Sequence, residues 1–294
     1  MKKLFALFLV VLSMGSLYAC DNEKDTIVIA SKPMTEQYIL SEMLAMLVED
    51  HTDLNVKLEQ GIGGGTSNIH PSMEQGEIDM YPEYTGTGWL FVLEEELIRD
   101  PDELYENVKD RYEEEYGIVW SGMYGFNNAY GLAVRDEVAE EHDLETYSDL
   151  ADVSDTLVFG AEYDFYERDD GYDALVEEYG FDFEDTSELD IGLKYEAIGE
   201  EDVDVINVFT TDGRLEAYDI RVLEDDKQYF PTYYGATLIR EEVLDDHPEL
   251  LDVVNKLEGK ISDETMTQMN YLVDVENEDP EEVARDFLEE EGLR

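Results

Sequence analysis

The chain has 294 residues with 76 acidic and 19 basic side chains, which give a formal net charge of -57 at pH 7. This charge excludes nucleic-acid binding, because recognition of phosphates needs a basic face. A hydrophobic fraction of 43% and an aromatic fraction of 11%, spread along the whole chain, predict a folded protein, although high net charge opposes compaction.

The first 20 residues have the charge and hydrophobicity pattern of a secretory signal. Lys2 and Lys3 precede an apolar run over residues 4–12, and small and apolar residues then lead to Cys20. The apolar run is too short for a bilayer-spanning helix, which takes about 20 residues. We therefore expect residues 1–19 to be a signal peptide that lies outside the fold.

Cys20 is the single cysteine of the chain. It follows Leu17, Tyr18 and Ala19, which together resemble a bacterial lipobox. The resemblance implies a lipid attached to Cys20 and an extracytoplasmic protein anchored to the membrane. The alternative is an ordinary cleaved signal that leaves a free cysteine. With one cysteine the chain forms no intramolecular disulfide, and a metal site would have to be built without thiolates.

In the first half of the chain, β-branched and apolar runs alternate with amphipathic segments. We expect strands at residues 26–30, 55–60 and 78–81, with a helix at residues 35–49 capped by Thr35 and another that begins near Ser67. This strand and helix order predicts a parallel sheet with right-handed crossovers.

The second half repeats the same order. Further strands are expected at residues 132–134, 157–159, 203–206 and 237–239, and helices at residues 147–150, 172–179, 248–257, 262–272 and 280–288. About 275 residues after the signal are enough for two ordinary domains. We expect two α/β lobes, one formed by residues 20–127 and 233–294 and the other by residues 128–232, with a ligand cleft between them.

The surplus of acidic side chains indicates a protein that works in concentrated salt. At about 1 M ionic strength the Debye length is roughly 3 Å, so the repulsion among surface carboxylates is largely screened. The alternative is an acidic surface that recruits cations or a basic partner.

Residues 81–88 (Tyr-Pro-Glu-Tyr-Thr-Gly-Thr-Gly) place aromatic faces and short hydroxyls beside glycines, just after a predicted strand. Open α/β sheets bind ligands at the carboxyl ends of their strands. A quaternary ammonium group has no N–H to donate, so a protein must surround it with aromatic faces, each worth about 0.5 to 2 kcal/mol. Tyrosines in such a loop suit that task.

Six segments, taken in order, resemble the extracytoplasmic proteins that capture glycine betaine and related quaternary amines for ABC importers. They are residues 31–38, 61–67, 76–88, 125–128, 168–172 and 210–214. The resemblance implies a periplasmic-binding-protein type II-like α/β fold whose lobes close around the ligand. It also implies a receptor without catalytic residues, cofactor or metal, whose partners are an ABC permease and its ATPase.

The same resemblance implies an aromatic cage made by Tyr84, Tyr130, Phe209 and Tyr233. Phe209 departs from the tyrosine that is usual in the family, and its ring keeps the aromatic face but loses the phenol. Tyr234 is an alternative to Tyr233, because neighbours on a strand point to opposite sides.

The resemblance places Arg168, Lys32 and Thr87 near the carboxylate of the ligand. A guanidinium binds a carboxylate with two hydrogen bonds, so Arg168 would favour betaines over choline. Gln37 is a further candidate, and its alternative is a position on the helix face without ligand contact.

The motifs leave open whether the ligand is glycine betaine, proline betaine, carnitine or choline. A choline or amino-acid receptor on the same fold is the alternative function. A secreted hydrolase would need a nucleophile with a base beside it, and no such pair is evident in the sequence. The acidic clusters also lack the spacing of a calcium-binding loop.

Overall fold

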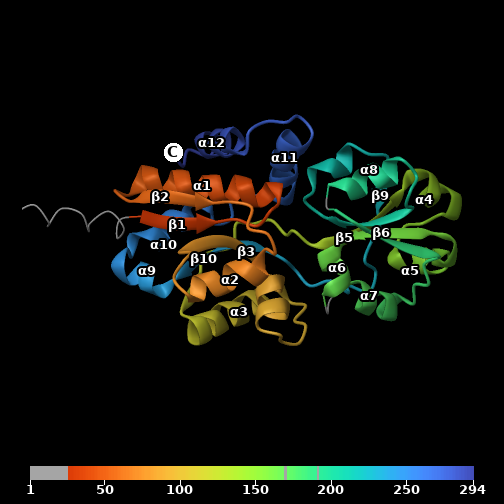
Figure 1. Ribbon diagram of the computed structural model, residues 1–294, viewed down its shortest axis with the longest axis horizontal. Helices are drawn as coiled ribbons and strands as arrows, with labels where there is room; N and C mark the ends of the chain where they lie inside the picture. The colour runs from red at the N-terminus through yellow and green to blue at the C-terminus, as the bar shows by residue number, and fades with distance from the viewer. Residues whose placement is uncertain (1–25, 169–170, 191) are drawn as a thin grey trace, which may run out of the picture.

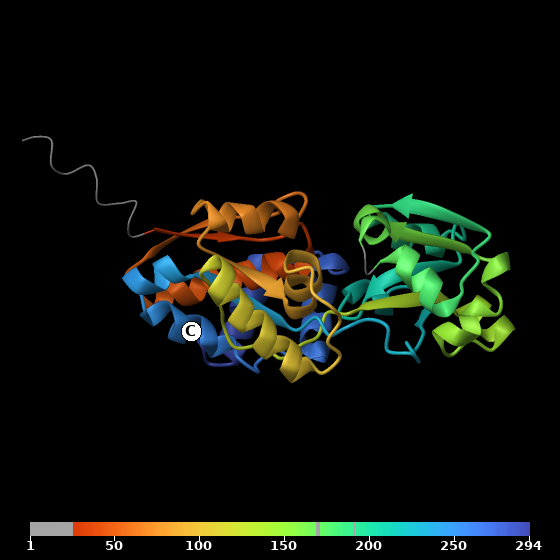
Figure 2. The same cartoon turned by 90° about the horizontal axis from the view of Figure 1, so that it is seen from below.

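Within residues 26–168, 171–190 and 192–294, which the computed structural model describes, the strands form two five-stranded sheets. Each sheet is the centre of its own lobe, and the two lobes lie side by side in both views (Figures 1 and 2). The predicted signal peptide and Cys20 lie outside the described residues. No helix in the described part of the chain has both the length and the apolar character needed to cross a membrane.

Lobe 1 contains the sheet with strand order β2-β1-β3-β10-β4. Its strands are β1 (Thr26–Ala30), β2 (Asn55–Glu59), β3 (Met80–Tyr84), β4 (Ile118–Trp120) and β10 (Gly235–Arg240). Its helices are α1 (Thr35–His51), α2 (Thr66–Glu74), α3 (Pro101–Tyr116), α9 (Glu241–Asp246), α10 (Glu249–Val254), α11 (Asp263–Asp274) and α12 (Pro280–Glu290), with the π-helical turn η1 (Thr87–Val92) and the 3-10 turn η4 (Asn255–Leu257).

Helices cover both faces of the lobe 1 sheet (Figure 1). On one side α1 and the C-terminal helices share a core that includes Ile39, Leu44 and Phe287. On the other side α2 and α3 pack through Ile69 and Val108. Because both faces are covered, all five residues of β3 are buried, and Tyr84 at the end of the strand still belongs to the lobe 1 core.

Lobe 2 contains the sheet with strand order β7-β6-β8-β5-β9. Its strands are β5 (Tyr130–Arg135), β6 (Val158–Glu162), β7 (Asp185–Leu189), β8 (Val205–Phe209) and β9 (Ile220–Val222). Its helices are α4 (Asp136–His142), α5 (Tyr147–Ala151), α6 (Tyr163–Glu167), α7 (Tyr172–Tyr179) and α8 (Leu193–Gly199), with the 3-10 turns η2 (Ser154–Thr156) and η3 (Gly213–Glu216).

Both sheets are mixed, which corrects the expectation of a parallel sheet. β1 runs parallel to β2 and β3, but β10 runs antiparallel to β3 and β4. In lobe 2, β5 is likewise antiparallel to β8 and β9. The reason is the path of the chain: β5 and β10 each enter a lobe from the cleft, whereas β3 and β8 end there.

The predicted cap of α1 is wrong. Met34, not Thr35, is the N-cap residue, and it makes no side-chain hydrogen bond to the helix. The hydroxyl of Thr35 instead donates to the Asp274 carboxylate at 2.6 Å and so ties α1 to α11. The predicted loop at 81–88 is also shorter than expected, because β3 continues to Tyr84.

The chain passes between the lobes twice, between β4 and β5 and again between β9 and β10. We propose that the lobe boundaries lie at residues 127/128 and 232/233. Asn127 and Tyr234 pair in an isolated antiparallel bridge, so the two crossings lie side by side there and form one hinge.

Candidate ligand-binding site

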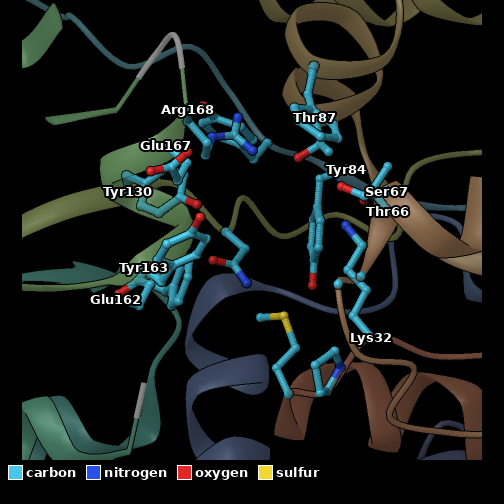
Figure 3. A pocket seen from close by; sticks show the side chains of 18 residues that line it. Lys32, Thr66, Ser67, Tyr84, Thr87, Tyr130, Glu162, Tyr163, Glu167 and Arg168 are labelled. Atoms are coloured by element: carbon cyan, nitrogen blue, oxygen red, sulfur yellow. The ribbon is translucent and has the colours of Figure 1, made fainter. Parts of the chain in front are cut away.

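A cavity of about 340 Å³ lies between the two lobes. Figure 3 shows Lys32, Tyr84 and Thr87 on one side, with Tyr130 and Arg168 on the other. The predicted residues that line the cavity are Lys32, Tyr84, Thr87, Tyr130, Arg168, Phe209 and Tyr233. The tertiary structure therefore gathers, from both lobes, nearly all of the residues that the motifs indicated.

The aromatic side chains gather around Tyr130. Its ring centroid lies 5.1 Å from that of Phe209 and 5.7 Å from that of Tyr233, which it meets edge to face. The β5–β8 register explains the first contact, because Tyr130 lies directly opposite Phe209. Tyr84 lies across the cavity from Tyr130 (Figure 3). Aromatic faces from both lobes thus border the same space.

Tyr233, rather than Tyr234, lines the cavity. Its ring lies so close to the backbone that a Cβ atom on Gly86 would come within 2.7 Å of it. The neighbouring Tyr234 donates its backbone N–H to the hydroxyl of Thr85 at 3.1 Å. Gly86 therefore allows the close approach that places Tyr233 beside the Tyr84 strand end.

Gln37 lies behind Tyr84 and does not line the cavity. Its side-chain amide donates to the Tyr84 hydroxyl at 3.0 Å, and its residue is fully buried. The Tyr84 hydroxyl donates in turn to Glu36 at 2.6 Å. These two contacts hold the Tyr84 ring in place at the cavity wall.

Glu36, which the motifs did not single out, connects the two lobes. Besides Tyr84, its carboxylate accepts hydrogen bonds from Asn128 in the first crossing at 2.8 Å and from Thr211 of lobe 2 at 2.7 Å. Asn270 of α11 donates to it at 3.3 Å. Burial raises the pKa of Glu36 above its ordinary value of 4.5, although the hydrogen bonds from its neighbours act in the opposite direction.

Lys32 is buried at the lobe 1 side of the cavity and forms an ion pair with Glu83. Glu83 also accepts hydrogen bonds from Thr66 at 2.7 Å and Tyr81 at 2.8 Å. Burial lowers the pKa of Lys32, while the Glu83 carboxylate opposes that shift. The Lys32 ammonium lies 4.8 Å from the Tyr84 ring centroid. Its charge is therefore compensated within lobe 1.

Arg168 lies between rings of both lobes. Its guanidinium carbon is 5.6 Å from the centroid of Phe91, in η1, and 5.6 Å from that of Tyr130, in β5. Phe91 is 41% exposed, so its ring is available at the mouth of the cavity. This geometry places a cation where a ligand carboxylate could meet it.

Lobe 2 contributes a carboxylate that the motifs also missed. Glu162, at the end of β6, lines the cavity and pairs with the fully buried Lys194 at 2.8 Å. Asn207 donates to its other oxygen at 2.8 Å. The position of Glu162 at the carboxyl end of a parallel strand is the signal that could have identified it.

Among the described residues, no group of three or more His, Cys, Asp or Glu side chains has the arrangement of a metal site. The buried carboxylates of the cavity instead have hydrogen-bond and ammonium partners, which are what buried charges need.

Comparison with known proteins identifies the family. The model for the substrate-binding domain of the ABC-type glycine betaine transport system matches residues 25–290. A carnitine transport binding protein of Listeria monocytogenes is 38% identical over 98% of this chain and 96% of its own. A glycine-betaine-binding protein of Pseudomonas aeruginosa is 35% identical over 92% of this chain and 89% of its own.

A Helicobacter pylori protein named as an ergothioneine transport permease and ergothioneine binding protein is 43% identical over 98% of this chain. The chain spans 52% of that relative's length. Among solved structures, a glycine betaine/carnitine/choline ABC transporter protein superposes with a TM-score of 0.78 at 35% identity, covering 91% of this chain and 99% of that one.

These comparisons confirm both the predicted resemblance and the two-lobed α/β fold of periplasmic-binding-protein type II. The family consists of substrate-binding receptors of ABC importers, which are not enzymes. The alternative of a secreted hydrolase is thereby excluded.

The Glu36 network predicts a pH-dependent stability difference. In Glu36→Gln the amide N–H₂ faces donors, so we expect the free energy of unfolding to fall by about 1 to 3 kcal/mol. Because the pKa of Glu36 is raised by folding, its contribution is fully present below 4.5, the ordinary value, and is lost as pH rises through the folded pKa. The difference between wild type and Glu36→Gln should therefore shrink as pH rises, measured by urea unfolding in molar salt.

Glu289→Gln, on the exposed side of α12, is the matched control, and it should change stability by less than about 0.5 kcal/mol at every pH. A difference that grows with pH would contradict the assignment, because it would mean that folding makes the Glu36 carboxyl more acidic.

Proposed function

Since this chain belongs to the substrate-binding family of ABC-type glycine betaine transport systems, we propose that it captures glycine betaine or a related quaternary amine outside the cytoplasm. It then delivers this ligand to an ABC permease and its ATPase. The observation that carries the proposal is the cavity between the lobes, bordered by Tyr84 on one side and Tyr130 on the other.

The proposed cage consists of Tyr84, Tyr130, Phe209 and Tyr233. Their faces attract a trimethylammonium group, at about 0.5 to 2 kcal/mol per ring, the upper value where water is excluded. Phe209 offers its ring without a phenol, and the nearby Tyr130 and Tyr233 keep their hydroxyls. The cage makes no hydrogen bond to the cation, because a quaternary ammonium group has no N–H to donate.

Arg168 is the proposed partner of the ligand carboxylate, with Lys32 and Thr87 on the facing lobe. Because Lys32 is paired with Glu83, the two charges nearly cancel. Lys32 would therefore contribute a hydrogen-bond donor to the ligand carboxylate but little net positive charge. Arg168 lies over Tyr130, so a carboxylate bound there would have the cage beside it. This spacing of anion and cation sites favours a zwitterion over choline.

The proposed mechanism is closure of the two lobes about the hinge, with no bond made or broken. Closure would exclude water from the rings and the guanidinium, which strengthens both attractions. The Glu36 network lies at the hinge and joins Tyr84 to Asn128 and Thr211, so it couples cage position to lobe position.

We also propose that the mature chain is anchored to the membrane through a lipid on Cys20. The support is the order of charged, apolar and small residues before that cysteine. In cells, Cys20→Ser should move the protein from the membrane fraction to the soluble extracytoplasmic fraction, measured by fractionation and immunoblotting. Retention of the variant in the membrane fraction would refute the anchor.

The net charge of -57 supports a high-salt setting. In dilute buffer the surface carboxylates repel one another, whereas at about 1 M salt the Debye length is roughly 3 Å. We expect the melting temperature to rise between 0.05 and 1 M NaCl, about the range over which screening becomes effective. A melting temperature that is unchanged or falls would instead favour an acidic surface that recruits a basic partner.

The cage is tested by titrating the lipid-free protein with glycine betaine in molar salt. Trp89 lies in η1, close after Tyr84, so its fluorescence should report binding, and calorimetry gives the affinity independently. We expect Tyr84→Ala to weaken binding at least about tenfold, because a ring face and its contact area are lost. Tyr234→Ala, whose ring does not line the cavity, is the matched control and should keep near wild-type affinity.

The same titration with choline separates the two ligand classes. If Arg168 binds the carboxylate, Arg168→Ala weakens glycine betaine strongly and choline little. Unchanged glycine betaine affinity in Arg168→Ala would favour the alternative, a choline or amino-acid receptor on this fold.

A further inference from the structure

The Glu162 carboxylate is built into the cavity wall and has no role in the function proposed above. Glu162 is only 5% exposed, yet it lines the cavity. One of its oxygens accepts from Lys194 at 2.8 Å and the other from Asn207 at 2.8 Å. Both partners are fully buried, so the carboxylate is held in one orientation.

Resting on the proposed function, we propose that Glu162 determines specificity by accepting a hydrogen bond from the ligand. The ligand is then a betaine that carries an N–H or O–H donor in addition to its carboxylate and its quaternary ammonium group. Glycine betaine, which has no such donor, would be a weaker ligand than a donor-bearing relative.

The position of Glu162 supports a third contact point. Figure 3 shows Arg168 and Glu162 at opposite ends of the lobe 2 wall, with Tyr130 between them. A ligand whose carboxylate meets Arg168 and whose ammonium group lies at Tyr130 has its remaining substituent directed toward Glu162. The cavity of about 340 Å³ falls within the roughly 300 to 1,000 Å³ of pockets that enclose ligands larger than the smallest betaine.

The chemistry of the group selects the kind of substituent. An ionised carboxylate only accepts hydrogen bonds and offers about four lone-pair sites. Lys194 and Asn207 occupy one site on each oxygen, which leaves further acceptor sites on a residue that lines the cavity. Closure over a ligand without a donor would remove water from these sites and leave them without a partner, whereas an N–H or O–H group would satisfy one of them.

Calorimetry of the wild-type protein in molar salt tests the inference without any substitution. The probes are glycine betaine, which lacks a donor, carnitine, whose hydroxyl lies between its ammonium group and its carboxylate and so away from Glu162, and ergothioneine, whose ring N–H groups are on a third substituent. We expect at least one donor-bearing compound to bind about tenfold or more tightly than glycine betaine, as a hydrogen bond to a charged group allows.

Glu162→Gln should reduce that ratio to about threefold or less, because the amide is a weaker acceptor than the carboxylate. The Lys194 charge that this substitution leaves unpaired acts on the ammonium group of all three compounds alike, so it changes their affinities together and not the ratio. Lys194→Met is the second variant, since it breaks the same ion pair but keeps the acceptor, and it should retain the wild-type ratio. If either substitution disturbed the structure of lobe 2 as a whole, the affinities of all three compounds would fall together. The ratio of the affinity for the donor-bearing compound to that for glycine betaine would then stay unchanged.

Three results would overturn the inference. Equal binding of all three compounds to the wild-type protein removes the need for a donor. An equal loss for all compounds in Glu162→Gln, with an unchanged ratio, assigns Glu162 to attraction of the ammonium group or to lobe structure. Absence of binding by every compound, choline included, overturns the proposed function and this inference with it.

Discussion

The carboxylate of Glu36 is the interaction on which the arrangement of the two lobes and the cavity depends. It accepts hydrogen bonds from Tyr84 at the end of β3, Asn128 in the first crossing, Thr211 after β8 and Asn270 in α11. A buried carboxylate requires such partners, because an unpaired charge away from water is very costly. The same requirement draws Tyr84, the first crossing and lobe 2 toward one point.

The path of the backbone through the hinge then places the rings. In each lobe a strand that ends at the cleft pairs with a strand that starts there, so Tyr84 lies opposite Gly235 and Tyr130 opposite Phe209. The rings of Tyr124 and Phe126 in the lobe 1 core pack against the backbone of Gly235. A Cβ atom added to Gly235 would lie only 2.9 Å from each of these rings. The antiparallel entry of β5 and β10 is thus what concentrates aromatic side chains at the carboxyl ends of β3 and β8.

The buried charges follow one pattern in both lobes. In lobe 1, Lys32 pairs with Glu83 and its ammonium lies 4.8 Å from the Tyr84 ring centroid. In lobe 2, Lys194 pairs with Glu162 and its ammonium lies 5.0 Å from the Phe209 ring centroid. A chain so rich in carboxylates on its surface therefore keeps two balanced pairs at its cavity.

The amino-acid sequence by itself determined the family, the two-lobed α/β fold and most of the strand positions, because apolar periodicity and short motifs are local. It also indicated Tyr84, Tyr130, Arg168 and the other motif residues that line the cavity. Only the tertiary structure decided that Tyr233 rather than Tyr234 lines it, that Gln37 lies behind Tyr84, and that Glu36 and Glu162 belong to the site. The reason is distance along the chain: the partners of Glu36 lie 48, 92, 175 and 234 residues away, and no local pattern records which side chains a fold brings together over such separations.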